Sequence, residues 1–173
     1  MFPPRKIFHP FAFLLCLTAG ADWSAGKDRS TSISRQFLVY GADVQVRGMI
    51  CDLAERTKSD LLRLLGLRDS WQTPLIVNLD YPRANVPDTR LVRLEVSQLG
   101  YGLKLQLNLL LTREMKGANV QRELLRAILI ELMYRDRGNL AAGMPYVTPP
   151  DWLVEGTLAL QPGRASDNDA ELL

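Results

Sequence analysis

Two long segments of the chain repeat apolar residues every three or four positions, which is the spacing of an amphipathic helix. The first covers residues 43–65, where Asp43 is placed to cap the start and Gly66 to end the helix. The second covers residues 119–137, with Asn119 as the expected N-cap. Because each segment gathers its apolar residues on one stripe, both helices are expected to pack on a common core.

Four other segments are predicted to be strands. In the clearest of them leucines alternate with Lys104, Gln106 and Asn108, so that one face is apolar and the other polar. This strand follows its predecessor after a Gly-Tyr-Gly turn, which indicates an antiparallel hairpin. The predicted strands are 33–40, 74–79, 90–97 and 102–111. Together the elements predict an α+β fold, with a small mixed or antiparallel sheet packed by two main helices.

The first 21 residues have the pattern of a secretory signal peptide. Arg5 and Lys6 precede an apolar run at 11–17, and a small-x-small cleavage site ends at Ala21. We therefore expect a secreted, periplasmic or cell-envelope protein of bacterial type, with no stable membrane span after cleavage. An uncleaved membrane anchor is the alternative, although the apolar run is short for a span.

Signal removal changes both the organisation and the charge of the chain. The remaining chain is expected to consist of a flexible lead-in (22–31), one domain (32–160) and a polar tail (161–173). The full sequence holds 21 basic and 19 acidic residues, so loss of Arg5 and Lys6 leaves 19 of each. This balance argues against nucleic-acid binding, which normally requires a basic surface.

The processed chain would contain neither a histidine nor a pair of cysteines. His9, the only histidine, lies in the signal segment, so no imidazole metal site or catalytic triad is expected. Cys51 would be the one remaining cysteine, in a helical and apolar context that predicts a buried side chain. A disulfide within the chain is then impossible.

A third, shorter helix is expected over 152–160, after a loop rich in glycine and proline. Its first half contains the string Pro-Asp-Trp-Leu-Val-Glu-Gly, in which the glutamate is Glu155. Upstream, the second long helix contains the string Ile130-Glu131-Leu-Met-Tyr134, and 20 residues separate its tyrosine from Glu155. These strings resemble the gluzincins, a family of zinc peptidases, and in particular their peptidase MA-like branch. Members carry His-Glu-x-x-His on one helix and Pro-x-Trp-Leu-x-Glu-Gly on the next.

The resemblance implies a role for each of these positions. Glu131 corresponds to the general base and Glu155 to the third metal ligand, whereas Ile130 and Tyr134 stand where members have histidines. Isoleucine has no lone pair and a tyrosine hydroxyl ionises only near pH 10, so no zinc and no other cofactor is expected. The resemblance also implies a fold like the N-terminal lobe of thermolysin-like peptidases. There, an edge strand above the metal helix binds extended substrate, and the nearest counterpart is the strand at 102–111.

The leading interpretation is therefore an exported pseudoenzyme that acts as a binding or structural domain for an unknown protein or peptide partner. Trp152 is expected to pack on the helix that carries Glu131, and Trp152 with Asp151 forms a candidate binding pair. Glu131 falls inside the apolar arc of its helix, so it is expected to be partly buried. Its expected partners are Arg126, Arg135, Arg137 or Tyr134.

Two other interpretations stay open. One is a hydrolase in which the carboxylates of Glu131, Glu155 and Asp151 hold a hard cation such as Ca²⁺ or Mg²⁺, or act as an acid–base pair without a metal. The other is an accidental resemblance in an α+β domain of unrelated origin.

Overall fold

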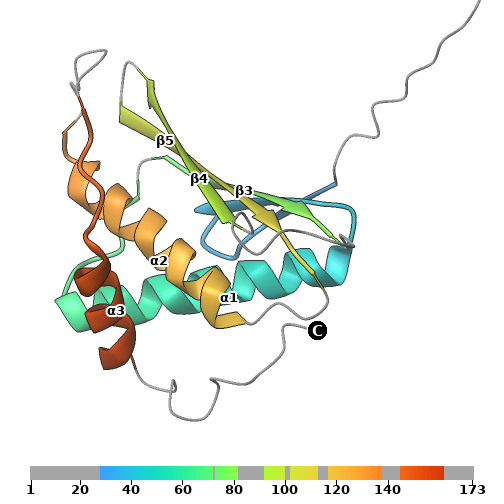
Figure 1. The fold of residues 1–173 in the computed structure, drawn as a ribbon. Helices are drawn as coiled ribbons and strands as arrows, with labels where there is room; N and C mark the ends of the chain where they lie inside the picture. The colour runs from blue at the N-terminus through green and yellow to red at the C-terminus, as the bar shows by residue number, and fades with distance from the viewer. Residues whose placement is uncertain are drawn as a thin grey trace, which may run out of the picture.

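The computed structural model describes residues 28–71, 73–81, 92–99, 102–112, 117–137 and 145–161. These residues form one five-stranded sheet and three helices, which is an α+β arrangement (Figure 1). The elements in chain order are β1 (Arg29–Thr31), β2 (Phe37–Tyr40), α1 (Val44–Leu65), β3 (Leu75–Asp80), β4 (Val92–Leu99), β5 (Gly102–Leu110), α2 (Gly117–Tyr134) and α3 (Asp151–Leu160).

The sheet is mixed, with the strand order β1-β2-β3-β5-β4. β2 and β3 are parallel neighbours, and α1 supplies the crossover that a parallel pair requires. β3 and β5 are also parallel, whereas β4 pairs with β5 as the antiparallel hairpin predicted from the sequence. β5 is an internal strand and β4 is the outer one, so β4 rather than the segment 102–111 lies at this edge of the sheet.

The three helices lie on one side of the sheet, with α1 and α2 crossing beneath it and α3 beside α2 (Figure 1). Strand alternation directs every second side chain toward these helices, and these side chains form the core with the apolar stripes of α1 and α2. The strand members of this core are Phe37, Val39, Leu75, Val77, Leu79, Leu103, Leu105, Leu107 and Leu109. The predicted packing of two amphipathic helices on a sheet is therefore confirmed.

The opposite face of the sheet is largely polar along β5. Asn78 donates a hydrogen bond to Asn108 Oδ1 over 2.8 Å, and Gln106 donates to the same oxygen over 3.3 Å. Asn108 lies opposite Asn78 on β3 and Arg93 on β4, so the polar side chains form a row across three strands. This is the division between an apolar and a polar face that the alternating leucines of β5 predict.

The start of the first predicted strand was wrong. Instead of a continuous strand over 33–40, the chain makes a turn and only Phe37–Tyr40 is extended. Ser32 organises this turn, because its carbonyl accepts from the Arg35 N–H and its hydroxyl accepts from the Phe37 N–H. Such local hydrogen bonds compete with strand pairing, and they hold Arg35 at a φ of 62°.

Two further boundaries differ from the sequence-based expectation. Residues 29–31 of the expected flexible lead-in form β1, which pairs with β2 as a short hairpin, so the sheet has five strands rather than four. α2 begins at Gly117, so Asn119 lies inside its first turn and is not the N-cap. The signal segment (1–21) and all but the first residue of the tail (161–173) lie outside the described residues. Within the described part of the chain, no helix combines the length and apolar character needed to cross a membrane.

Both predicted ends of α1 are confirmed. Asp43 is the N-cap, and its Oδ1 accepts from the N–H groups of Gln45 and Val46 at 2.8 and 3.1 Å. Gly66 ends the helix with a φ of 63°, a left-handed conformation that residues with a Cβ adopt only at a cost. Within the same helix, a Cβ added at Gly48 would meet no atom within 4 Å.

These two glycines predict opposite effects of the same substitution. Gly48→Ala should raise the free energy of unfolding by about 0.5–1 kcal/mol, because alanine loses less backbone entropy in a helix. Gly66→Ala should lower it by roughly 1 kcal/mol, because alanine is strained at positive φ. Urea unfolding followed by circular dichroism measures both, and shifts of the same sign would contradict the described boundaries of α1.

Candidate functional site

The two positions that the resemblance sets against histidines, Ile130 and Tyr134, are both buried. Ile130 is completely inaccessible to solvent and belongs to the hydrophobic core. The Tyr134 hydroxyl accepts a hydrogen bond of 2.6 Å from the backbone N–H of Val147. Val147 belongs to the segment 145–150, which leads into α3, and this segment therefore lies against the face of α2 on which a metal would have to bind.

Glu131 is buried and paired, as its place in the apolar arc predicts. Its Oε2 forms an ion pair with the guanidinium of Arg135, one helical turn later, and Arg135 Nε lies 3.0 Å from the same oxygen. Arg135 is itself buried, donates to Ser70 Oγ over 3.1 Å and lies over the ring of Trp71. Of the partners considered from the sequence, Arg135 is the one that the structure brings to Glu131. The pair ties α2 to the segment that follows α1.

The carboxylates of α3 are paired with a different part of α2. Asp151 lies 2.9 Å from Arg126, and Glu155 lies 2.8 Å from Arg122. The Arg126 guanidinium holds the pKa of Asp151 below its usual value, mainly through their hydrogen bond. Burial lowers the pKa of Arg126, but Asp151 and Glu123 outweigh this effect and raise it overall. These ion pairs fix α3 along the first half of α2.

Glu131 and Glu155 do not converge in this arrangement. Arg122, the partner of Glu155, precedes Glu131 by nine residues on α2. An α-helix rises about 1.5 Å and turns about 100° per residue, so Arg122 lies ~13.5 Å from Glu131 along the helix axis and about half a turn away from it around the axis. Within the described ranges, no three side chains of the metal-ligating types are grouped closely enough to hold an ion. The two glutamates are bound by arginines at different parts of α2.

The expected packing of Trp152 on α2 was wrong. Trp152 is 73% exposed, while Val154, Thr157 and Leu158 supply the buried face of α3. Trp152 is the second residue of α3, so it lies two positions before Val154 and about 160° from it around the helix. The string Trp-Leu-Val cannot reveal from spacing alone which of three consecutive apolar residues is turned outward.

Sequence reasoning missed two buried cations on α1. Arg47 donates to Ser30 Oγ over 2.9 Å and to the carbonyls of Gly41 and Ala42, whereas Lys58 pairs with Glu55 and Asp69. Arg47 and Lys58 are 11 positions apart, so they lie on nearly the same face of the helix, and this spacing was the signal available in the sequence.

Cys51, on the same helix, is buried as predicted. Burial is the main cause that raises the pKa of its thiol, and the charges of Asp52 and Glu55 add to the effect. The thiol is therefore protonated at neutral pH and unsuited to act as a nucleophile.

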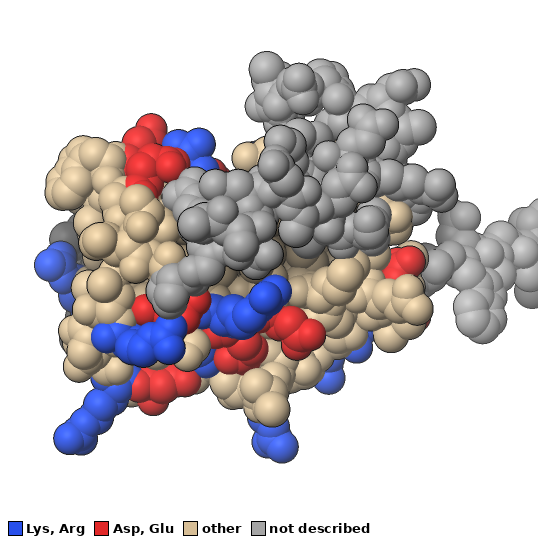
Figure 2. All heavy atoms as spheres, turned by 90° about the horizontal axis from the view of Figure 1, so that it is seen from below, with Lys and Arg blue, Asp and Glu red and all other residues tan. Residues whose placement is uncertain are grey.

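Comparison of this chain with protein-family models, with curated proteins and with solved structures gives no match. On the face of the molecule seen in Figure 2, basic and acidic side chains are interspersed rather than gathered by sign.

Neutralising the buried carboxylate of Glu131 should affect the stability of the protein much more than neutralising the exposed carboxylate of Asp151. Glu131→Gln should lower the free energy of unfolding by about 3 kcal/mol, because it leaves the charge of Arg135 buried without its partner. Asp151→Asn, which removes an exposed carboxylate, should leave the urea midpoint nearly unchanged. A double variant, Glu131→Leu with Arg135→Met, should recover much of the loss. Equal effects of the two single variants would contradict the structural role given to Glu131.

Proposed function

We propose that this protein is an exported, non-catalytic domain with the frame of a zinc metallopeptidase, and that it binds a protein partner through the outer face of α3. The resemblance of the two strings on α2 and α3 to those of gluzincins supports the choice of frame. The described helices and strands are compatible with it, since a mixed sheet is packed on one face by two long helices and has an antiparallel strand, β4, at its edge.

The burial of the former ligand positions supports the absence of peptidase chemistry. A catalytic zinc site requires three protein ligands and an open position for water. Ile130 lies in the core, the Tyr134 hydroxyl is bound by a backbone N–H, and Glu131 is bound by a buried arginine. Without a metal to acidify it, a water near Glu131 forms no appreciable hydroxide at neutral pH. No observation favours the alternative of a carboxylate hydrolase.

The exposure of Trp152 is the observation that carries the binding proposal. The most exposed residues of α3 are Asp151, Trp152, Gly156, Ala159 and Leu160, and the Glu155 side chain is partly exposed, so this surface carries two carboxylates beside its apolar residues. Leu160 is 69% exposed, and Val147, just before the helix, is 63% exposed. Tryptophan is the side chain most enriched at the energetic centres of protein interfaces, since it buries a large area at a small entropic cost.

Asp151 gives the proposed surface a fixed charge beside the tryptophan. It is exposed, yet its carboxylate is oriented by Arg126 from α2. A partner that covers α3 would therefore present an apolar pocket for Trp152 and a hydrogen-bond donor or cation at its margin. Both residues of the candidate binding pair thus lie on the surface that we propose.

The purified protein should contain no stoichiometric zinc and show no chelator-sensitive peptidase activity. The double variant Ile130→His with Tyr134→His should gain at most weak zinc affinity, because Glu155 remains bound near Arg122 and cannot complete the site. Elemental analysis after dialysis, together with cleavage of a fluorogenic peptide library, measures both. Stoichiometric zinc in the natural chain, with activity lost in Glu131→Gln, would refute the proposal of a non-catalytic domain.

The proposed surface predicts position-specific cross-linking to one partner. A benzophenone amino acid placed at position 152 should give a discrete adduct when the native host is irradiated. The same group at Val44, which is 65% exposed on α1, serves as the matched control and should give none. Leu160→Asp should abolish the adduct at position 152 by placing a charge in the apolar contact. Identical adduct patterns at positions 152 and 44 would exclude α3 as the binding surface.

A further inference from the structure

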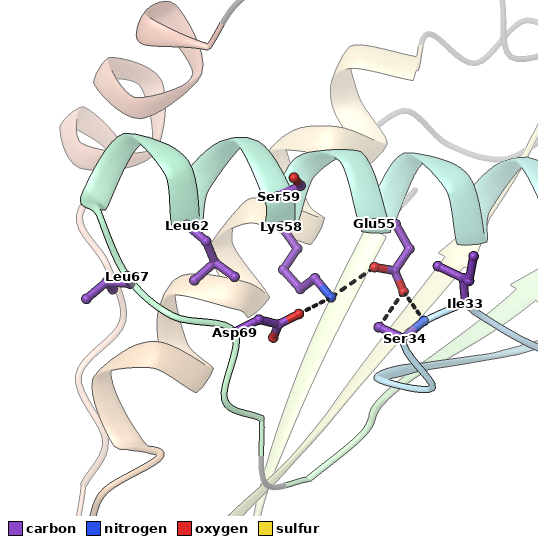
Figure 3. Close-up of a pocket in the computed structure, with 8 residues that line it drawn as sticks. All are labelled: Ile33, Ser34, Glu55, Lys58, Ser59, Leu62, Leu67 and Asp69. Atoms are coloured by element: carbon purple, nitrogen blue, oxygen red, sulfur yellow. Dashed lines mark hydrogen bonds and ion pairs between the residues drawn. The ribbon is translucent and has the colours of Figure 1, made fainter.

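A pocket of about 390 Å³ lies between α1, the turn that joins β1 to β2, and the segment that follows α1 (Figure 3). Its volume is at the lower end of the range found for small-ligand sites, roughly 300–1,000 Å³. No residue of α2 or α3 lines it, so the pocket is independent of the surface proposed above.

The floor of the pocket is the buried ammonium group of Lys58. Its Nζ lies 2.9 Å from Glu55 Oε2 and 3.0 Å from Asp69 Oδ2 (Figure 3). It also lies 2.5 Å from Gln36 Oε1. An ammonium has three N–H donors, and these three acceptors use all of them. Lys58 is therefore not available to donate to an incoming anion, which argues against a phosphate or carboxylate as the ligand.

The pocket instead carries surplus negative charge, because two carboxylates face one ammonium. Burial raises the pKa of Glu55, but hydrogen bonds from Ser32, Ser34 and Lys58 outweigh burial and lower it overall, so Glu55 is ionised at neutral pH. Asp69 is the more open of the two, with a side chain that is 42% exposed. Its Oδ1 accepts from Gln36 over 2.8 Å and its Oδ2 from Lys58, which leaves each oxygen able to accept once more.

The rim of the pocket is aliphatic. Ile33, at the tip of the turn, is 94% exposed and contributes nothing to the core, and Leu67 is about half-exposed. Leu62 adds a buried apolar wall on the side of Leu67, whereas Ile33 lies at the opposite end of the pocket, beyond Glu55 (Figure 3). A ligand that contacts both the ionic floor and the aliphatic rim must combine a cationic head with an apolar stem.

We propose that this pocket binds a primary ammonium group on an unbranched aliphatic stem, with Asp69 accepting from the ammonium and Leu62 and Leu67 contacting the stem. A compact ammonium suits Asp69 better than a guanidinium, because the planar fork of arginine pairs best with two unoccupied carboxylate oxygens. The side chain of a lysine in a peptide and a free diamine share this chemistry.

The first test is a titration of the ¹⁵N-labelled protein with n-pentylamine, followed by NMR. The amides of Leu67 and Asp69 should shift, and pentanoate, which has a similar stem and the opposite charge, should leave them unchanged. Asp69→Asn should weaken pentylamine binding about fivefold, whereas Asp60→Asn, on α1 but outside the pocket, should not.

A second pair of variants tests the aliphatic rim without disturbing the ionic floor. Leu67→Ser should weaken binding about threefold, and Val44→Ser, an equally simple change at an exposed apolar residue outside the pocket, should not. Since the Leu67 side chain is about half-exposed and its backbone N–H still bonds to the Leu62 carbonyl, this variant stays informative even if Asp69→Asn unfolds the segment after α1. Cadaverine and an acetylated, amidated lysine peptide then distinguish the two sources, and tighter binding of either supports the proposal. Equal binding of pentanoate, or amine binding that is unchanged in both Asp69→Asn and Leu67→Ser, would overturn it.

Discussion

The constraint on which the arrangement of this domain depends is the burial of α2. Nine of its 18 residues are buried, and they point in directions that cover most of the circumference of the helix. The sheet and α1 cover one part of this circumference, and α3 with the segment 145–150 covers another. A helix enclosed in this way cannot carry an unpaired charge, because a buried charge without a partner costs several kcal/mol. The polar side chains of α2 are consequently bound in pairs.

Those pairs determine what the helix can do chemically. Glu131 is bound by Arg135 and the Tyr134 hydroxyl by Val147, so these groups serve to hold neighbouring segments in place. The same residue types at the same spacing could support hydrolysis only if they faced water and a cation. Function is therefore to be sought where the fold leaves side chains unused, and Trp152 on α3 is the largest of them among the described residues.

Most of the fold was predicted from apolar residues that recur every second position in strands and every three or four positions in helices. The caps of α1, the hairpin of β4 and β5, and the burial of Glu131 follow from spacing and from the chemistry of single residues. The turn at Ser32 could not be predicted in this way, because a β-prone string and a serine that binds its own backbone compete, and only the geometry decides between them. The order of the strands could not be predicted from the sequence either, since neither β4 nor β5 carries a residue that marks an edge strand.

The candidate site was harder to predict because ion pairs join residues that are distant in the sequence. Lys58 is a charged residue in a helix, and its burial becomes understandable only once Asp69 and Gln36 are brought to it by the chain that follows α1 and the turn before β2. α3 is attached by the same principle, with Arg122 and Arg126 of α2 binding Glu155 and Asp151. The sheet and the two long helices are thus held by apolar burial, and ion pairs add to apolar burial where α3 attaches through Val154 and Leu158. Exposed ion pairs weaken with salt and buried ones much less, so the pairs of Asp151 and Glu155 should depend on ionic strength more than the buried pairs of Lys58.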